Sequence, residues 1–181
     1  MGGLRQLFDS LSREQRRNQD LLVSLAFAQR SFTNLQRFLE LVPLVAARLV
    51  GVEGALLVPF QMDGSLWRDH LQAIPAASCQ DLLRRLAAYE PGLSVGFGTD
   101  EEQLLAMDQL VQRLSPGSAL FATSVVSRGR PRGRLYVFDP SGGLICTDFQ
   151  RRHVQMVADL AGVAIENDQM LKEARRHERV D

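Results

Sequence analysis

The stretch TDFQRRHVQMVADLAGVAIENDQMLKEA, residues 147–174, decides the fold of this chain. Thr147 and Gln150 have the spacing of a capping box, in which two side chains satisfy free backbone N–H groups at the start of a helix. No proline interrupts the residues that follow, and Gly162 is the one residue that weakens a helix there. We therefore predict one long helix from Thr147 to Ala174.

The apolar residues of this helix form two neighbouring stripes with three- and four-residue spacing. The first stripe contains Met156, Leu160, Val163, Asn167 and Met170, and the second contains Val154, Val157, Ala161, Ala164 and Leu171. So wide an apolar arc predicts contact with two surfaces, such as a sheet and a partner helix. Asn167 would set the register between paired helices. The alternative is an ordinary C-terminal core helix.

Composition bounds the class of protein. The 181 residues are 45% hydrophobic, which suits one domain with a real core. Lys plus Arg and Asp plus Glu both total 21, so no overall field favours nucleic acid or a membrane surface. The chain lacks a long apolar run and a signal-peptide core, so we predict a cytoplasmic protein without a membrane span. Lys172 is its one lysine among many arginines, which we interpret as the mark of a GC-rich bacterial genome.

A heptad-like apolar pattern runs through the N-terminal region. Its members include Leu4, Leu7, Leu11, Leu21, Leu25, Ala28, Phe32, Leu35, Leu39, Val42 and Leu49. The pattern predicts dimerising helices of the coiled-coil type, and the alternative is a frayed arm. Thr33 and Gln36 have capping-box spacing and predict a new helix after Ser31. Pro43 should kink that helix or break one of its hydrogen bonds, and Gly51 should end it.

The middle of the chain predicts hairpins and short helices. Expected strands are Gly54–Phe60, Ser65–Ile74 after an Asp63-Gly64 turn, Ala119–Val126 and Arg134–Phe138, the last two joined by a loop over 127–133. Expected helices run from Ser78 to Tyr89 and from Thr99 to Leu114, on either side of a glycine-rich loop over 92–98. Hairpins without crossovers predict an antiparallel sheet with segregated helices, an α+β fold.

The residues after Phe149, VADLAGVAIEN over 157–167, resemble the closing helix of GAF domains. The resemblance is to the regulatory GAF module of a bacterial or cyanobacterial signalling protein, such as a sigma-regulator-type serine phosphatase. It implies a central antiparallel sheet of five to six strands. The N- and C-terminal helices would pack on one face, with a small-molecule pocket on the other. Gly133 and Leu135 fit the family's hairpin, whereas Arg132 and Arg134 replace aliphatic residues.

The same resemblance divides the chain into three parts. Residues 1–32 would form a signalling and dimerisation helix, 33–167 the GAF domain, and 168–181 a linker helix toward an effector domain. The polar, uncapped C-terminal residues predict that the chain is cut from a longer protein. We expect a homodimer paired through Leu21, Leu25, Met156, Leu160, Val163, Asn167 and Met170.

Candidate ligand-binding residues are the aromatics Trp67, Phe97, Phe121 and Tyr136, together with Arg134. Arg134 and Tyr136 alternate with Leu135 and Val137, so they would face away from the long helices and toward a pocket. An arginine there could hold an anionic ligand. The alternative is that the aromatics are plain core and Arg134 reaches solvent.

Four arginines within residues 128–134 could grip phosphates or an acidic partner, or simply be solvated. No aromatics interleave, which argues against nucleic acid.

No residue pattern predicts chemistry in this segment. His70, His153 and His177 lack metal-ligand spacing, and Cys79 and Cys146 fit no metal, redox or disulfide pattern. Neither cysteine precedes a histidine, as the attachment cysteine of bilin-binding GAF domains commonly does. We therefore predict no metal, no cofactor and no catalysis in this segment.

The sequence thus predicts a sensory or regulatory domain that binds an unknown small molecule or partner and controls an attached output through paired helices. The alternative is a ligand-free scaffold for dimerisation or protein–protein interaction. A third hypothesis, an enzyme, would depend on Cys79.

Overall fold

The computed structural model describes residues 2–31, 34–61, 66–74, 77–88, 100–114, 119–139 and 146–180. The helices are α1 (Gly2–Ser31), α2 (Leu35–Val50), α3 (Ala77–Ala88), α4 (Asp100–Leu114), α5 (Asp148–Val180) and the 3-10 helix η1 (Arg68–His70). The strands are β1 (Gly54–Pro59), β2 (Gln72–Ala73), β3 (Ala119–Ser127) and β4 (Arg130–Asp139). No helix in these ranges is both long and apolar enough to cross a membrane.

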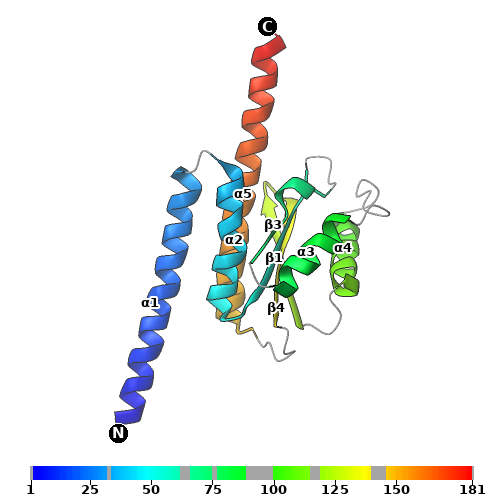
Figure 1. The fold of residues 1–181 in the computed structure, drawn as a ribbon. Helices are drawn as coiled ribbons and strands as arrows, with labels where there is room; N and C mark the ends of the chain where they lie inside the picture. Colours follow the sequence, from blue (N-terminus) through cyan, green and yellow to red (C-terminus); the bar gives the residue numbers. More distant parts are fainter. Residues whose placement is uncertain are drawn as a thin grey trace.

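The strands form one antiparallel sheet in the order β2-β1-β4-β3. Figure 1 shows α1, α2 and α5 on one side of this sheet and α3 and α4 on the other. The predicted α+β architecture is therefore confirmed. The described residues contain four strands rather than the five to six expected.

The predicted return strand over 65–74 is wrong for most of its length. Leu66 makes only an isolated bridge to Phe60, η1 follows, and β2 is two residues long. The strand ends early because the Arg68–His70 backbone turns into η1. The Asp63-Gly64 turn and the glycine-rich loop over 92–98 lie outside the described residues.

The hairpin of β3 and β4 is tighter than expected. Arg128 and Gly129 are its two turn residues, with φ of 53° and 73°. Two successive positive φ angles in a two-residue loop are typical of a type I′ turn, whose twist matches that of the flanking strands. The loop predicted over 127–133 is thus largely strand, and Arg130, Arg132 and Arg134 lie along β4.

The helix starts follow local side-chain chemistry. At α5 the Thr147 N–H donates to Gln150 Oε1 at 3.0 Å and the Gln150 N–H donates to Thr147 Oγ1 at 3.1 Å, which confirms the capping box. At α2 the cap is Asn34, whose Oδ1 accepts from the Gln36 N–H at 3.0 Å; the expected cap, Thr33, lies outside the described residues.

Two further helix ends were predicted. Gly51, with φ of 81°, ends α2 as expected. Helix α3 begins at Ala77, one residue before the expected start at Ser78.

Helix α5 lies directly on β3 at Gly162. A Cβ placed at Gly162 would come within 2.6 Å of the Val126 carbonyl oxygen, closer than atoms tolerate. The glycine that weakens the isolated helix is therefore what allows the helix and the strand to approach. The second apolar stripe faces the core here, and its members Val154, Val157 and Ala161 are fully buried.

We predict that Gly162→Ala lowers the free energy of unfolding by about 1–3 kcal/mol, because the added methyl overpacks the contact with Val126. This loss should appear although alanine favours an isolated helix by about 1 kcal/mol. Urea-induced unfolding measures the change. Gly3→Ala is the matched control, because a Cβ at Gly3 meets nothing within 4 Å. Equal effects at the two glycines would contradict the close approach.

Candidate functional site

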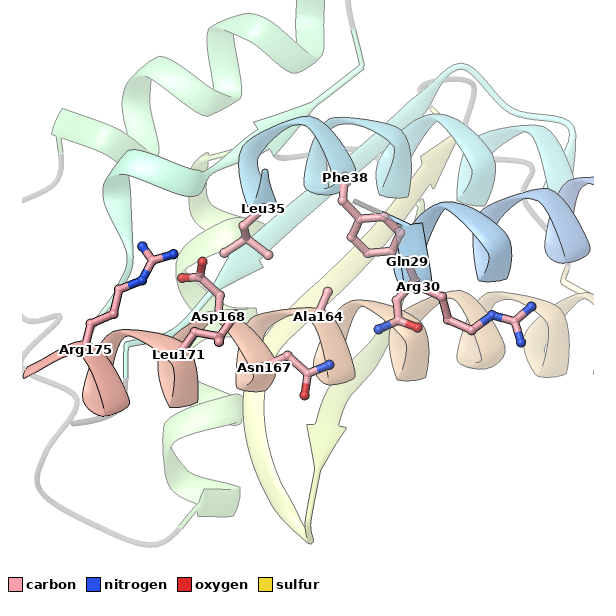
Figure 2. Close-up of a pocket in the computed structure, with 9 residues that line it drawn as sticks. All are labelled: Gln29, Arg30, Leu35, Phe38, Ala164, Asn167, Asp168, Leu171 and Arg175. Carbon is pink, nitrogen blue, oxygen red and sulfur yellow. The ribbon is translucent and has the colours of Figure 1, made fainter. Parts of the chain in front are cut away.

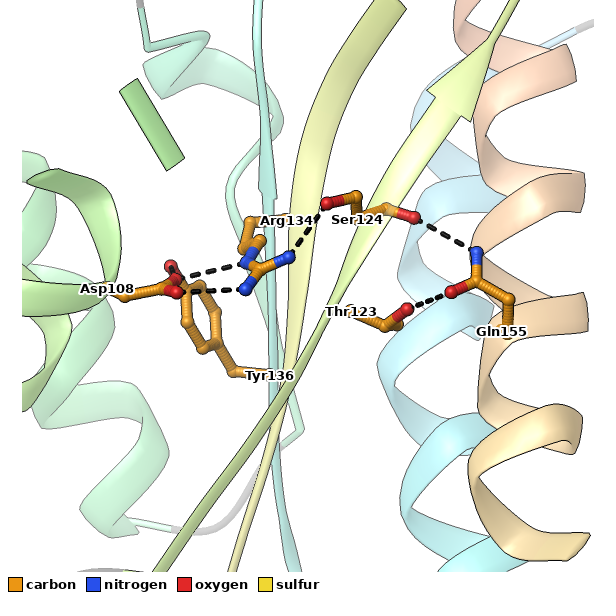
Figure 3. A network of polar contacts seen from close by, with 6 residues as sticks. All are labelled: Asp108, Thr123, Ser124, Arg134, Tyr136 and Gln155. Atoms are coloured by element: carbon orange, nitrogen blue, oxygen red, sulfur yellow. Dashed lines mark hydrogen bonds and ion pairs between the residues drawn. The ribbon is translucent and has the colours of Figure 1, made fainter. Parts of the chain in front are cut away.

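A cluster of polar side chains lies between the sheet and α4. Arg134 and Tyr136 project from β4 toward Asp108 of α4, and Ser124 of β3 lies beside them (Figure 3). Strand alternation sends Leu135 to the opposite layer, against the long helices. The cluster therefore lies on the face of the sheet away from α5.

Asp108 and Arg134 form a bidentate ion pair. Arg134 Nε donates to Asp108 Oδ1 at 3.0 Å, and Nη2 donates to Oδ2 at 2.8 Å. Arg134 Nη1 also donates to Ser124 Oγ at 2.7 Å. The Arg134 side chain is 16% exposed and the Asp108 side chain is 27% exposed. Arg134 is therefore mostly buried, and a carboxylate of its own chain is its counter-charge.

Tyr136 completes this cluster as a neutral phenol. Its hydroxyl donates to Asp108 Oδ1 at 2.7 Å, so the carboxylate accepts three hydrogen bonds. Burial raises the pKa of the Tyr136 hydroxyl, and the nearby Asp108 charge and hydrogen bond raise it further. The hydroxyl therefore stays protonated at ordinary pH and donates its proton to Asp108.

Polar contacts continue from this cluster to α5. Gln155 of α5 donates from Nε2 to the Ser124 carbonyl oxygen at 3.2 Å, and its Oε1 accepts from the Thr123 hydroxyl. Ser124 thus contacts Arg134 through its hydroxyl and Gln155 through its carbonyl (Figure 3). A chain of hydrogen bonds joins α4 on one face of the sheet to α5 on the other.

Glu166 holds the far end of β3. This buried carboxylate accepts from the Ser127 hydroxyl and pairs with Arg128, whose Nε lies 2.8 Å from Oε1. Arg128 and Arg134 are therefore both engaged within the chain. The Arg128 side chain nevertheless stays 71% exposed, so contact of this segment with solvent or with an acidic partner stays a prediction.

Sequence reasoning missed Asp108, Gln155 and Glu166 as site residues. Two signals were present. Asp108 stands four residues after Leu104 and three before Val111, which puts it on the apolar face of its helix. Glu166 stands one turn after Gly162, in the part of α5 that touches β3.

The structure does not bring the five predicted ligand-binding residues together. Phe121 pairs with Val137 across the hairpin and so faces α5, with the Arg151 guanidinium 5.5 Å from its ring centre. Trp67 packs against the helix layer, and Lys172 Nζ lies 5.2 Å from the centre of its ring. Both lie across the sheet from Arg134 and Tyr136. Phe97 lies outside the described residues, and a ligand at any of the five stays a prediction.

The titratable residues near the helices have structural partners. His70 Nδ1 lies 2.6 Å from Gln36 Oε1, and burial followed by the Lys172 charge lowers the pKa of His70. His153 packs edge-on against Phe149, and burial followed by Arg152 lowers its pKa.

Burial raises the pKa of the Cys146 thiol, and neither cysteine forms a disulfide. Within the described ranges, no three His, Cys, Asp or Glu residues are grouped to hold a metal.

The two stripes of α5 meet different surroundings. Every seventh residue from Phe149 is a large exposed hydrophobic: Phe149 is 44% exposed, Met156 50%, Val163 41% and Met170 46%. Between them Leu160 is half-buried and Asn167 is exposed. The first stripe therefore faces solvent, whereas most of the second is buried in the core.

Two residues expected on the dimer surface lie elsewhere. Leu25 is 2% exposed and half-buried Leu21 packs beside it, both in the core formed with α2 and α5. Both side chains pack within their own chain, and a role for them in a dimer stays a prediction.

No family model and no curated protein sequence matches this chain. Solved structures do match. A GAF domain assigned to a sensor histidine kinase from Pseudomonas syringae pv. tomato superposes with a TM-score of 0.58 at 13% identity, over 93% of this chain and 97% of that one. A methyl-accepting chemotaxis protein gives 0.51 at 14% identity, over 82% and 98%. The chromophore-binding domain of a Stigmatella aurantiaca bacteriophytochrome gives 0.51 at 14%, over 83% and 60%.

We predict that Asp108→Ala lowers the free energy of unfolding by about 2–3 kcal/mol, because it leaves the mostly buried Arg134 guanidinium without a counter-charge. The double variant with Arg134→Met should cost less than the sum of the two single changes. Chemical unfolding of the four proteins gives the coupling. Asp81→Ala is the control and should cost below about 1 kcal/mol, since its ion pair is on the surface. Strict additivity would show that the pair does not act as a unit.

We also predict a loss of stability at high pH that depends on Tyr136. The folded state keeps this phenol protonated where the unfolded chain loses the proton, above a pKa of about 10. The contribution is thus complete below pH 10 and falls as pH rises, by at most about 1.4 kcal/mol per pH unit. Unfolding measured across alkaline pH should show a steeper slope for the wild type than for Tyr136→Phe. Parallel slopes would refute the shift.

Proposed function

Because the chain has the fold of a GAF domain, we propose that it is the sensory or regulatory domain of a signalling protein and controls an attached output through paired α5 helices. The similar structures support this proposal, since they come from a sensor histidine kinase, a chemotaxis protein and a bacteriophytochrome. In this proposal the segment acts by binding and does not itself catalyse a reaction.

The exposed stripe on α5 carries the proposal. Large hydrophobic side chains recur on it every seven residues, the repeat that lets two helices pack along a seam. A row of this kind on a protein surface marks an interaction site. Asn167 lies within the row, where a polar residue sets register and oligomeric state. A second copy of the same helix supplies the matching stripe.

The continuity of α5 provides a route from domain to output. The same helix is held to β3 by Gln155 and Glu166 and then projects beyond the domain (Figure 1). A rigid helix carries a rotation or shift at its buried part to its projecting end. Binding at the domain would act by favouring one pairing of the two helices over another.

A ligand-free scaffold is the second candidate. It is favoured by the Asp108–Arg134 pair, which occupies the position where an anionic ligand was expected. Tyr136, Met107 and Leu86 of the core on this face of the sheet are almost fully buried. Native mass spectrometry of the protein purified from its own host separates the two candidates. A mass released on denaturation supports the sensor, and a dimer without added mass supports the scaffold.

We predict that Met156→Asp converts a dimer into a monomer. A buried carboxylate in the helix seam would weaken association by about a hundredfold or more. Sedimentation velocity over a concentration series measures the dissociation constant. Leu105→Asp is the matched control, since Leu105 is exposed on α4, away from the stripe. A monomeric wild type, or equal effects of both changes, would refute pairing through α5.

A further inference from the structure

A cavity of about 470 Å³ lies where the end of α1, the start of α2 and the middle of α5 meet (Figure 2). Its volume is in the range of sites that hold small molecules. It lies on the helix side of the sheet, across from the Asp108–Arg134 pair. It is thus separate from the site considered above.

The floor of the cavity is apolar. Phe38 is 1% exposed and presents its ring toward Ala164 (Figure 2). Leu35 and Leu171 line the same space, and Leu171 is 60% exposed at its edge. Covering this surface with an apolar body would remove exposed hydrocarbon from water, which favours binding.

The rim of the cavity is positively charged. Arg30 and Arg175 lie at its two ends (Figure 2), and neither makes an ion pair among the residues the structure describes. Asp168 is the one acid among the described lining residues, and Lys172 Nζ lies 3.1 Å from its carboxylate. With that carboxylate compensated, the net field at the cavity favours an anion.

We propose that this cavity binds a small organic anion with an aromatic or aliphatic body. The body lies on Phe38 and Leu35, and the anionic group takes charge-assisted hydrogen bonds from Arg30 or Arg175. Such an occupant touches α1 and α5 at once, directly beside Asn167 of the exposed stripe. It would therefore bias how α5 pairs; this consequence rests on the proposed function, whereas the binding itself does not.

Two probes that differ by one sulfonate group test the site on the full chain. One is 8-anilinonaphthalene-1-sulfonate, an aromatic body with one sulfonate. The other is N-phenyl-1-naphthylamine, the same body without the sulfonate. Fluorescence titration should give saturable binding of one sulfonated probe per chain, about tenfold tighter than the uncharged probe, because a charge-assisted hydrogen bond contributes this much.

Substitutions locate the binding. Of Arg30→Gln and Arg175→Gln, the change that removes the sulfonate's partner should weaken the sulfonated probe and leave the uncharged probe unchanged, and the two changes together should remove the difference between the probes. Arg176→Gln is the matched control, since Arg176 neighbours Arg175 but does not line the cavity. Ala164→Phe should fill the cavity and weaken both probes, with circular dichroism confirming that the helices remain.

The outcomes are distinct. The proposal is overturned if the two probes bind with equal affinity or if neither shows saturable binding. Binding that survives Ala164→Phe also overturns it, because the probe would then lie on an exposed surface such as the stripe. Loss of binding in Met156→Asp would also overturn it, by placing the probe in the interface of two copies. Retained binding in a monomeric Met156→Asp supports it. A wild type that binds the probe as a monomer would refute helix pairing while leaving this site intact.

Discussion

The seating of α5 on β3 is the contact on which the rest of the fold depends. At Gly162 the helix backbone approaches the strand with no side chain between them, and one turn later Glu166 pairs with Arg128 at the hairpin end. Gln155 makes a third attachment two turns before the glycine. Because these contacts fix both the height and the rotation of α5, they decide which residues face the core and which face solvent.

The Asp108–Arg134 pair gives the other face of the sheet a different character. A mostly buried ion pair adds little net stability, because desolvation of both charges offsets their attraction. It does specify geometry, since α4 can satisfy the guanidinium in few positions. The pair therefore orients α4 on the sheet, where aliphatic residues would permit sliding. Through Ser124 the same arginine is linked to the strand that carries α5.

Much of this architecture follows from local sequence patterns. The Thr147 capping box, the two stripes of α5 and the strands β1, β3 and β4 depend on neighbours in the chain and were predictable, whereas the return strand over 65–74 was not. The candidate sites were less predictable, because Asp108 and Arg134 are far apart in the sequence and come into contact only when α4 packs on the assembled sheet. Phe121 was misplaced for a similar reason. Its orientation depends on the register of β3 against β4, which the two-residue turn and a bulge between Val125 and Val126 set together and which hydropathy alone does not reveal.

The order of the strands limits how this protein can assemble. Among the strands that the structure describes, β2 lies at one edge of the sheet, is two residues long and offers little backbone to another chain. At the other edge, β3 has its Ser124 carbonyl occupied by Gln155 and α5 packed along it. Such edges resist strand addition, the common route to amyloid-like aggregation. Contacts with other molecules are thereby directed away from backbone pairing and toward the helical surface.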